Sequence, residues 1–160
     1  MTRAAIVVIG LVAAIQSPQT DLQFSGTWSA TGRRTTLPTE SARDASITSL
    51  SGVVVLDRSA AFASAFQAEA IGFDDGVSAQ TGRAVWTDSR GDRIFSTLTG
   101  QALQQGRRVS GTITGGTGQY AGATGDYELT WQYAVADENG VVHGRSTGFN
   151  GRIRRSAESR

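Results

Sequence analysis

The stretch from Tyr127 to Val135 reads Tyr-Glu-Leu-Thr-Trp-Gln-Tyr-Ala-Val and alternates between large apolar and polar side chains. Successive residues of a strand point to opposite faces of a sheet, so one face carries Tyr127, Leu129, Trp131, Tyr133 and Val135 and the other carries the polar residues. Such alternation is typical of an antiparallel sheet with one face buried and the other in water. The stretch therefore predicts a strand of an all-β domain.

Outside this strand, the chain is a series of β-prone runs separated by turn residues. The dipeptide Asn139-Gly140 and the segment Ser89-Arg90-Gly91-Asp92 predict hairpin turns. The polar residues 32–46 contain Pro38 and are expected to form a long loop. The further runs that predict strands are residues 24–31, 47–56, 82–88, 93–99, 108–114 and 141–153.

One segment, residues 59–71, fits two periodicities. Phe62 and Phe66 are four residues apart, which suits one face of a helix and equally one face of a strand. The local sequence does not decide between the two. With about eight strands and no certain helix, the sheet must cover its apolar face with itself, as a sandwich or a closed barrel.

The composition excludes several kinds of chemistry. The 160 residues include no cysteine and no lysine, and His143 is the only histidine. Thiol nucleophiles, zinc–thiolate sites, Schiff bases and multi-histidine metal sites are therefore excluded, and a Ser-His-Asp triad would have to use His143. We expect no cofactor and no metal site. His143 itself, just past a turn, is expected at the surface or at a barrel end.

The charge balance argues against polyanionic partners. The formal net charge is +1, and all fifteen basic residues are arginine. A balanced chain gives no electrostatic reason to bind nucleic acid, so we expect no nucleic-acid partner. Exclusive arginine usage is typical of a GC-rich bacterial genome. The basic residues near the C-terminus fit a solvated strand end and tail.

The N-terminus has the pattern of an export signal. Arg3 precedes the apolar run Ala4–Ile15, and small residues follow it. The run is shorter than the roughly 20 residues that span a bilayer, so no membrane span is expected; a buried first strand is the alternative. The sequence thus predicts a signal peptide at 1–20, a barrel domain at 21–155, a polar tail at 156–160, and a secreted or periplasmic protein.

The most distinctive motif is the glycine-rich stretch Gly111–Gly125. Residues 116–121 match the GxGxxA nucleotide fingerprint, but that fingerprint needs a helix directly after the loop, and Gly122 and Gly125 would break it. A nucleotide site is therefore rejected. The stretch is expected to form a bulged, tightly packed turn at a barrel end.

The sequence Gly115-Gly-Thr-Gly-Gln-Tyr-Ala-Gly-Ala-Thr-Gly125 resembles the glycine-rich signature of dirigent proteins and allene oxide cyclases. The hairpin before Arg93–Gly100 also fits, and the resemblance covers roughly residues 62–153. It implies a calycin-type, eight-stranded antiparallel barrel, a strand in residues 59–71, and a homotrimer. Dirigent proteins carry Ala-Arg-Gly where this chain has Ala-Thr-Gly at 123–125. No catalytic residue can be carried over.

An eight-stranded barrel has an interior that side chains fill or that holds one small ligand. Small residues at Ala68, Ala70, Ala84 and Gly100 are expected to leave open volume. The candidate ligand-binding wall is the set of large inward residues Phe62, Phe66, Trp86, Leu129, Trp131 and Tyr133.

Asp88 is the candidate catalytic group. It shares the face of Trp86 at a barrel mouth, where a desolvated carboxylate could act as acid or base. Its alternative role is that of a turn residue leading into Ser89-Arg90-Gly91.

Three functions fit these features. The first is an exported barrel that encloses a small apolar molecule. The second is a cofactor-free cyclase or isomerase acting on an unsaturated lipid-like, polyketide or phenolic substrate. The third is a filled barrel that acts as an interaction module.

Overall fold

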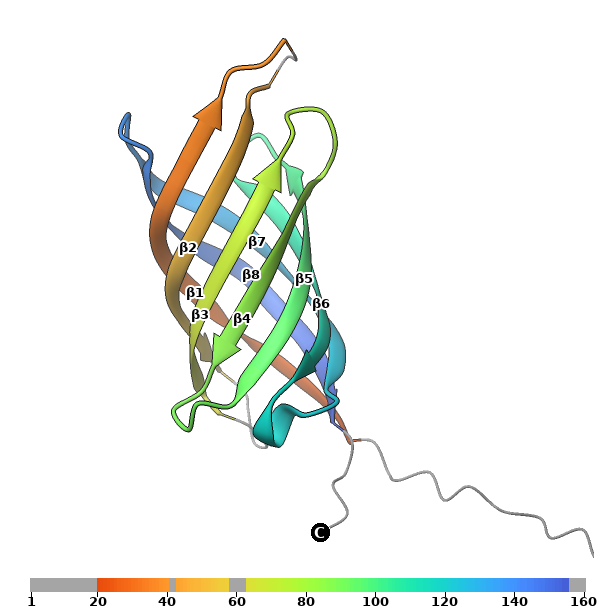
Figure 1. Cartoon of the computed structure of the whole chain (residues 1–160). Helices are drawn as coiled ribbons and strands as arrows, with labels where there is room; N and C mark the ends of the chain where they lie inside the picture. The colour runs from red at the N-terminus through yellow and green to blue at the C-terminus, as the bar shows by residue number, and fades with distance from the viewer. Residues whose placement is uncertain (1–19, 41–42, 58–62, 156–160) are drawn as a thin grey trace, which may run out of the picture.

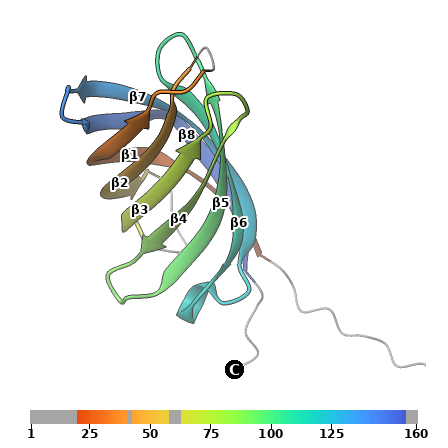
Figure 2. The same ribbon diagram turned by 45° about the horizontal axis from the view of Figure 1, so that its top comes forward.

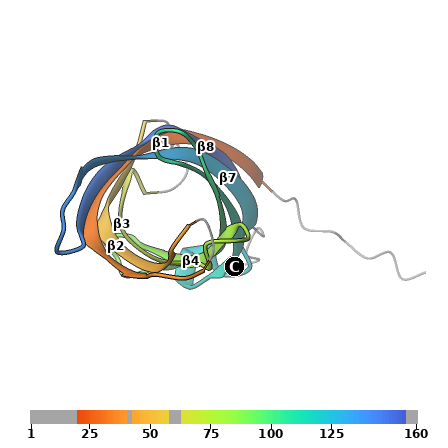
Figure 3. The ribbon, with the colours of Figure 1, turned by 90° about the horizontal axis from the view of Figure 1, so that it is seen from above.

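The computed structural model describes residues 20–40, 43–57 and 63–155, and they form a closed, eight-stranded antiparallel barrel (Figure 1). Each strand pairs with its sequence neighbour, and β1 pairs with β8 to close the ring, as the view along the axis shows (Figure 3). This confirms the predicted fold class. The strands are β1 (Thr20–Leu37), β2 (Ala45–Leu56), β3 (Ala65–Asp74), β4 (Gln80–Thr87), β5 (Arg93–Ala102), β6 (Arg107–Gly116), β7 (Thr124–Ala136) and β8 (Val141–Arg155).

The prediction of a loop at residues 32–46 is wrong for most of this segment. β1 continues to Leu37 and pairs with β2 up to the partners Leu37 and Ala45. The inward–outward alternation also continues, because Gly32 and Arg34 are half-buried while Arg33 is exposed. Pairing on both sides of β1 supports a strand in this polar sequence, and a local pattern does not contain that information.

The ambiguous segment is a strand where the structure describes it. β3 begins at Ala65, and its buried residues Phe66 and Ala68 alternate with exposed ones. β2 and β4 pair with it on either side, which satisfies its backbone groups only in the extended conformation. Phe62 lies outside the described residues.

Both predicted hairpin turns are present and depend on glycine. Gly91 has φ +86° in the β4–β5 turn and Gly140 has φ +78° in the β7–β8 turn. Other residues adopt such backbone conformations at a cost, which is why the glycines at these two positions indicated hairpin turns in the sequence. The β4–β5 turn and the 3₁₀ helix η1 (Gly118–Tyr120) lie at one end of the barrel, which we call the closed end.

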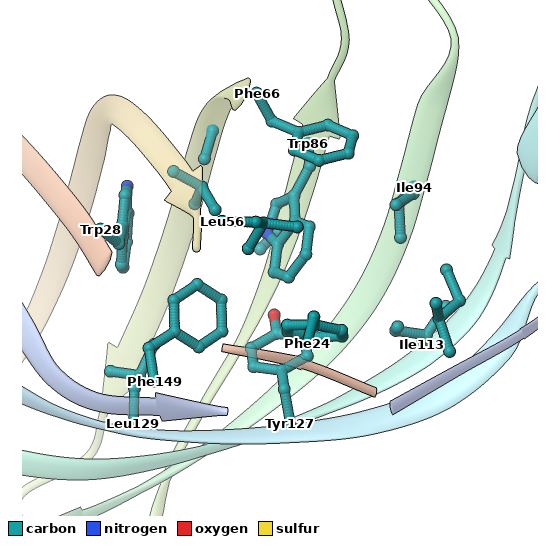
Figure 4. Packing of buried hydrophobic residues seen from close by; sticks show 14 of the residues in the cluster. Phe24, Trp28, Leu56, Phe66, Trp86, Ile94, Ile113, Tyr127, Leu129 and Phe149 are labelled. Atoms are coloured by element: carbon teal, nitrogen blue, oxygen red, sulfur yellow. The ribbon is translucent and has the colours of Figure 1, made fainter. Parts of the chain in front are cut away.

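The other end carries the β1–β2, β3–β4 and β7–β8 connections, and we call it the open end; Figure 2 tilts it toward the viewer. The core is concentrated in the closed half. Figure 4 shows aromatic rings from opposite walls meeting there, with Trp86 in edge contact with Phe24 and Phe149 at centroid distances of 6.0 and 5.6 Å. Aromatic pairs in this geometry add to the stabilisation from burial.

Among the described residues, no helix has the length and apolar character to cross a bilayer.

Candidate functional site

The open half of the barrel contains a pocket of about 60 Å³. It reaches solvent at the open end, and residues from seven strands, β1 to β7, contribute to its wall. The residues that define it are Trp28, Thr48, Leu50, Ala70, Gly72, Gln80, Gly82, Leu98, Gly100, Arg107, Val109, Trp131 and Tyr133.

A smaller pocket of about 20 Å³ lies deeper in the barrel. Trp28, Ala70, Leu98 and Val109 line both, so the deeper pocket continues the open one toward the aromatic core. Its floor includes Trp86, Leu129, Tyr127 and Phe149. The two together form an apolar funnel, wide at the mouth and closed at its base.

Small side chains on neighbouring strands explain why this half is hollow. Ala70 of β3 pairs with Ala84 of β4, and Gly72 pairs with Gly82. Gly100 follows on β5 and also lines the open pocket. The interior of an eight-stranded barrel is just wide enough for side chains to fill it, so small residues such as Ala70 leave space, while the Gln80 side chain lies against Gly72 and Gly100. The predicted small residues Ala68, Ala70, Ala84 and Gly100 all lie on one or both linings.

Two tryptophans form an aromatic wall of the open pocket. The rings of Trp28 and Trp131 lie 4.9 Å apart between centroids, tilted by 46°. Tyr133 meets Trp131 edge-on at 6.2 Å. Gly144 of β8 permits this arrangement, because a Cβ there would collide with the six-membered ring of Trp131. The wall is aromatic, and its three rings are inclined to one another.

An ion pair crosses the mouth of the pocket. The Asp74 carboxylate accepts from the Arg107 guanidinium at 2.8 Å, joining β3 to β6, which are not paired with each other. Burial acts to raise the pKa of Asp74, but the hydrogen bonds from the Gly76 N–H and Arg107, together with the charges of Arg107 and Arg43, outweigh it and hold the pKa below its usual value. Asp74 is therefore ionised at neutral pH and positions Arg107 beside the pocket.

Asp88 lies at the closed end and lines neither funnel pocket. One of its oxygens accepts from the backbone N–H groups of Arg90 and Asp92, and the other accepts from Gln119 at 2.7 Å and Tyr120 at 3.2 Å. Burial acts to raise its pKa, and these hydrogen bonds outweigh it and lower the pKa. The catalytic role of Asp88 stays a prediction, while these contacts favour its alternative role in the turn.

The glycine-rich stretch closes the barrel rather than lining the pocket. It places the fully buried Tyr120 over Phe66, at a centroid distance of 5.9 Å. Gly118 has φ +52°, and a Cβ on it would collide with the Asp92 carboxylate. The motif is therefore a structural end plug, as its predicted role as a packed turn suggested.

The predicted wall residues separate into two groups. Trp131 and Tyr133 line the open pocket, whereas Trp86 and Leu129 line the deeper one. Phe66 is buried in the closed-end core and lines neither. Phe62 falls among the undescribed residues, and ligand contact by any of these side chains stays a prediction. His143 is exposed on β8.

Sequence analysis missed Trp28, Asp74 and Arg107. The signal was the spacing along each strand, because residues an even number of positions apart point to the same face. Asp74 is an even number of residues from the inward Phe66, and Arg107 is an even number from the inward Ile113. Asp74 and Arg107 lie outside every run for which a strand was predicted, and the first strand was given no face. Leu50, Leu98 and Val109 share the same inward parity on β2, β5 and β6.

No protein-family profile and no curated protein matches the chain. Among solved structures, the chain is similar to a pterocarpan synthase dirigent protein, with a TM-score of 0.50 and 11% identity over 96% of this chain and 98% of the other. A pyocyanin demethylase also matches, with a TM-score of 0.43 and 15% identity over 80% of this chain and 98% of the other. The first comparison shows that the chain has the fold of a dirigent barrel, as the glycine signature implied.

Proposed function

We propose that this protein binds one small apolar molecule in the funnel at the open end of the barrel. The observation that carries the proposal is the contrast between the two halves. Aromatic side chains fill the closed half, whereas small side chains such as Ala70 leave space in the open half beside the indole wall. Ligand sites are typically concave, mostly apolar and equipped with a few polar groups.

The same contrast supports binding over the two alternatives. A filled interaction module would not need a row of small inward residues beneath an open mouth. A cyclase or isomerase would need an acid or base aimed at the substrate. Neither Asp74 nor Asp88 is among the lining residues, and Glu69, which contributes to the deeper lining, is exposed and has the outward parity on β3. Binding is therefore the function that the described geometry supports best.

Replacing Ala70 by phenylalanine is expected to abolish binding of an apolar fluorescent probe. Ala70 lines both parts of the funnel, and the added ring would occupy the space that a ligand needs. Titration with the probe, followed by quenching of tryptophan emission, measures the effect. Ala65→Phe is the matched control, because Ala65 is exposed on the outer face of the same strand. Equal binding by wild type and Ala70→Phe would contradict the proposal.

We also propose that the protein is exported from a bacterial cell. The support is the pattern of Arg3 followed by the apolar run Ala4–Ile15. The native protein is expected to begin between Ile15 and Asp21, which mass spectrometry of the purified protein measures. An intact Met1–Arg160 chain in the cytoplasm would contradict it.

A homotrimer is the assembly that the resemblance implies, and we propose it for this chain. The outer face of β2 and β3 exposes apolar side chains: Ile47 pairs with Phe73 across the strands, and Ile71 lies two residues away. Exposed apolar clusters are typical of contact surfaces. Sedimentation equilibrium is expected to give three times the chain mass, and a monomer at high concentration would argue against self-association.

A further inference from the structure

The unpartnered polar atoms of the barrel are confined to the open half. In the described part of the chain, four buried side-chain polar atoms have no hydrogen-bond partner: Trp28 Nε1, Trp131 Nε1, Arg34 Nε and Ser46 Oγ. All four belong to inward positions toward the open end. Buried polar groups are nearly always hydrogen-bonded, so a cluster of exceptions requires an explanation.

The closed half shows the opposite behaviour. The Tyr127 hydroxyl is 2.8 Å from Ser96 Oγ. Asp88 and Tyr120 are bonded to each other and to their surroundings. The barrel therefore satisfies these buried polar groups where it is filled, and the four unsatisfied atoms lie in the open half, two of them on residues that line the funnel. Polar groups held in this way are suited to an incoming molecule.

Three of the four unpartnered atoms can only donate hydrogen bonds. Indole and guanidinium nitrogens donate hydrogen bonds and do not accept them, and the serine hydroxyl does either. Trp28 and Trp131 both line the open pocket, and a molecule lying on their rings would bring its edge atoms near the indole N–H groups. Such a molecule satisfies these groups only if it carries acceptor oxygens.

The charges at the mouth also bear on the chemistry of the ligand. Arg34 and Arg107 are inward-facing cations, and Asp74, which pairs with Arg107 at 2.8 Å and lies 3.9 Å from Arg43, is an inward-facing carboxylate. The nearest loop acid, Asp75, is already engaged by the backbone N–H groups of Val77 and Ser78. Among the described residues, the inward-facing charges at this end are two arginines and one aspartate, which favours an anionic group over a cationic one.

From these two features we propose that the ligand is an apolar acid, whose ring or chain lies against the indole wall while its carboxylate accepts from the indole N–H groups near the arginines. The inference rests on the proposed binding function and names the chemical class of its ligand. Hydrogen bonds to a charged acceptor are about twice as strong as neutral ones, which makes the end group decisive.

Three probes with the same apolar part test the end group: 3-phenylpropionate, 3-phenylpropan-1-ol and 3-phenylpropylamine. Calorimetric titration of the wild-type protein is expected to show the acid binding about tenfold or more tightly than the amine, with the alcohol between them. Trp131→Phe and Trp28→Phe keep an aromatic ring and remove one N–H. Each is expected to reduce the acid's advantage severalfold, whereas Trp86→Phe, in the deeper pocket, leaves it unchanged.

Indole N–H resonances of ¹⁵N-tryptophan-labelled wild type provide a second readout that needs no variant. The acid is expected to shift the Trp28 and Trp131 signals downfield and to leave Trp86 nearly in place. Equal affinity for all three probes, or tighter binding of the amine, would overturn the inference while the binding function stands. Binding of none of the three by the folded protein would overturn the binding function and the inference together.

Discussion

Replacing Arg107 by methionine is expected to lower the free energy of unfolding by about 3 kcal/mol at neutral pH, as measured by urea denaturation. The Asp74 side chain is 3% exposed, and its shortest ion pair is the one with Arg107. Methionine keeps the apolar stem but leaves a buried carboxylate without that partner. Arg43 lies 3.9 Å from Asp74 and its side chain is 44% exposed, so it replaces little of the interaction with Arg107.

An exposed ion pair is the matched control. Arg152 donates to Asp126 at 2.8 Å, a shorter contact than most, yet both side chains are about half exposed. Arg152→Met is therefore expected to cost less than about 1 kcal/mol. A similar cost for Arg107→Met and Arg152→Met would show that burial of the Asp74 pair does not matter.

The effect of pH distinguishes loss of the partner from simple loss of packing. The pKa of Asp74 in the wild type lies below its usual value, so its ionised form contributes stability above the unfolded pKa of about 3.9, and this is lost as pH falls through the lowered value. Without Arg107, burial dominates and raises the pKa in the folded variant. The variant's deficit should then shrink as acidification neutralises Asp74. A deficit that does not change with pH would contradict this account.

Tyr120→Ala is expected to have the largest effect on stability, a loss of about 4 kcal/mol, because Tyr120 is fully buried and its ring closes the end of the barrel over Phe66. The substitution also removes a donor from the buried Asp88 carboxylate. Thermal and urea unfolding measure the change.

Two variants separate the causes. Tyr120→Phe removes only the hydroxyl and is expected to cost about 1 kcal/mol, since Asp88 keeps Gln119 and two backbone donors. Tyr133→Ala removes a half-buried tyrosine at the open end and is expected to cost less than Tyr120→Ala. Equal losses for the two alanine variants would mean that the plug is not part of the core. Probe binding by Tyr120→Ala should fall only with its folded fraction.

The two sets of experiments examine opposite ends of one barrel. The closed end carries the packing that stabilises the fold, including the glycine-rich plug, and the open end carries the hollow, the indole wall and the ion pair. Substitutions at the closed end are therefore expected to change stability, while substitutions in the funnel wall change ligand affinity.

The sequence alone determined the elements and their faces wherever a local pattern recorded burial. Alternation from Tyr127 placed Trp131 and Tyr133 inside, and Gly91 and Gly140 marked hairpins, because only backbone geometry and side-chain polarity were needed. The same alternation was wrong for Val135, which is 52% exposed because the β7–β8 register shifts between Tyr133 and Val135. The same reasoning identified Ala70 and Gly100 as sources of open volume. It failed at residues 32–37, where polar side chains lie in a strand held by its neighbours.

Only the tertiary structure decided which residues meet. Trp28 and Trp131 lie far apart in the chain and form one wall because closure pairs β1 and β7 with β8. Asp74 and Arg107 reach each other across a mouth whose width depends on all eight strands. Asp88 and Tyr120 meet because the plug folds back over the β4–β5 turn. Parity fixes the face of each residue, whereas its height in the barrel depends on strand register, which long-range pairing and bulges set.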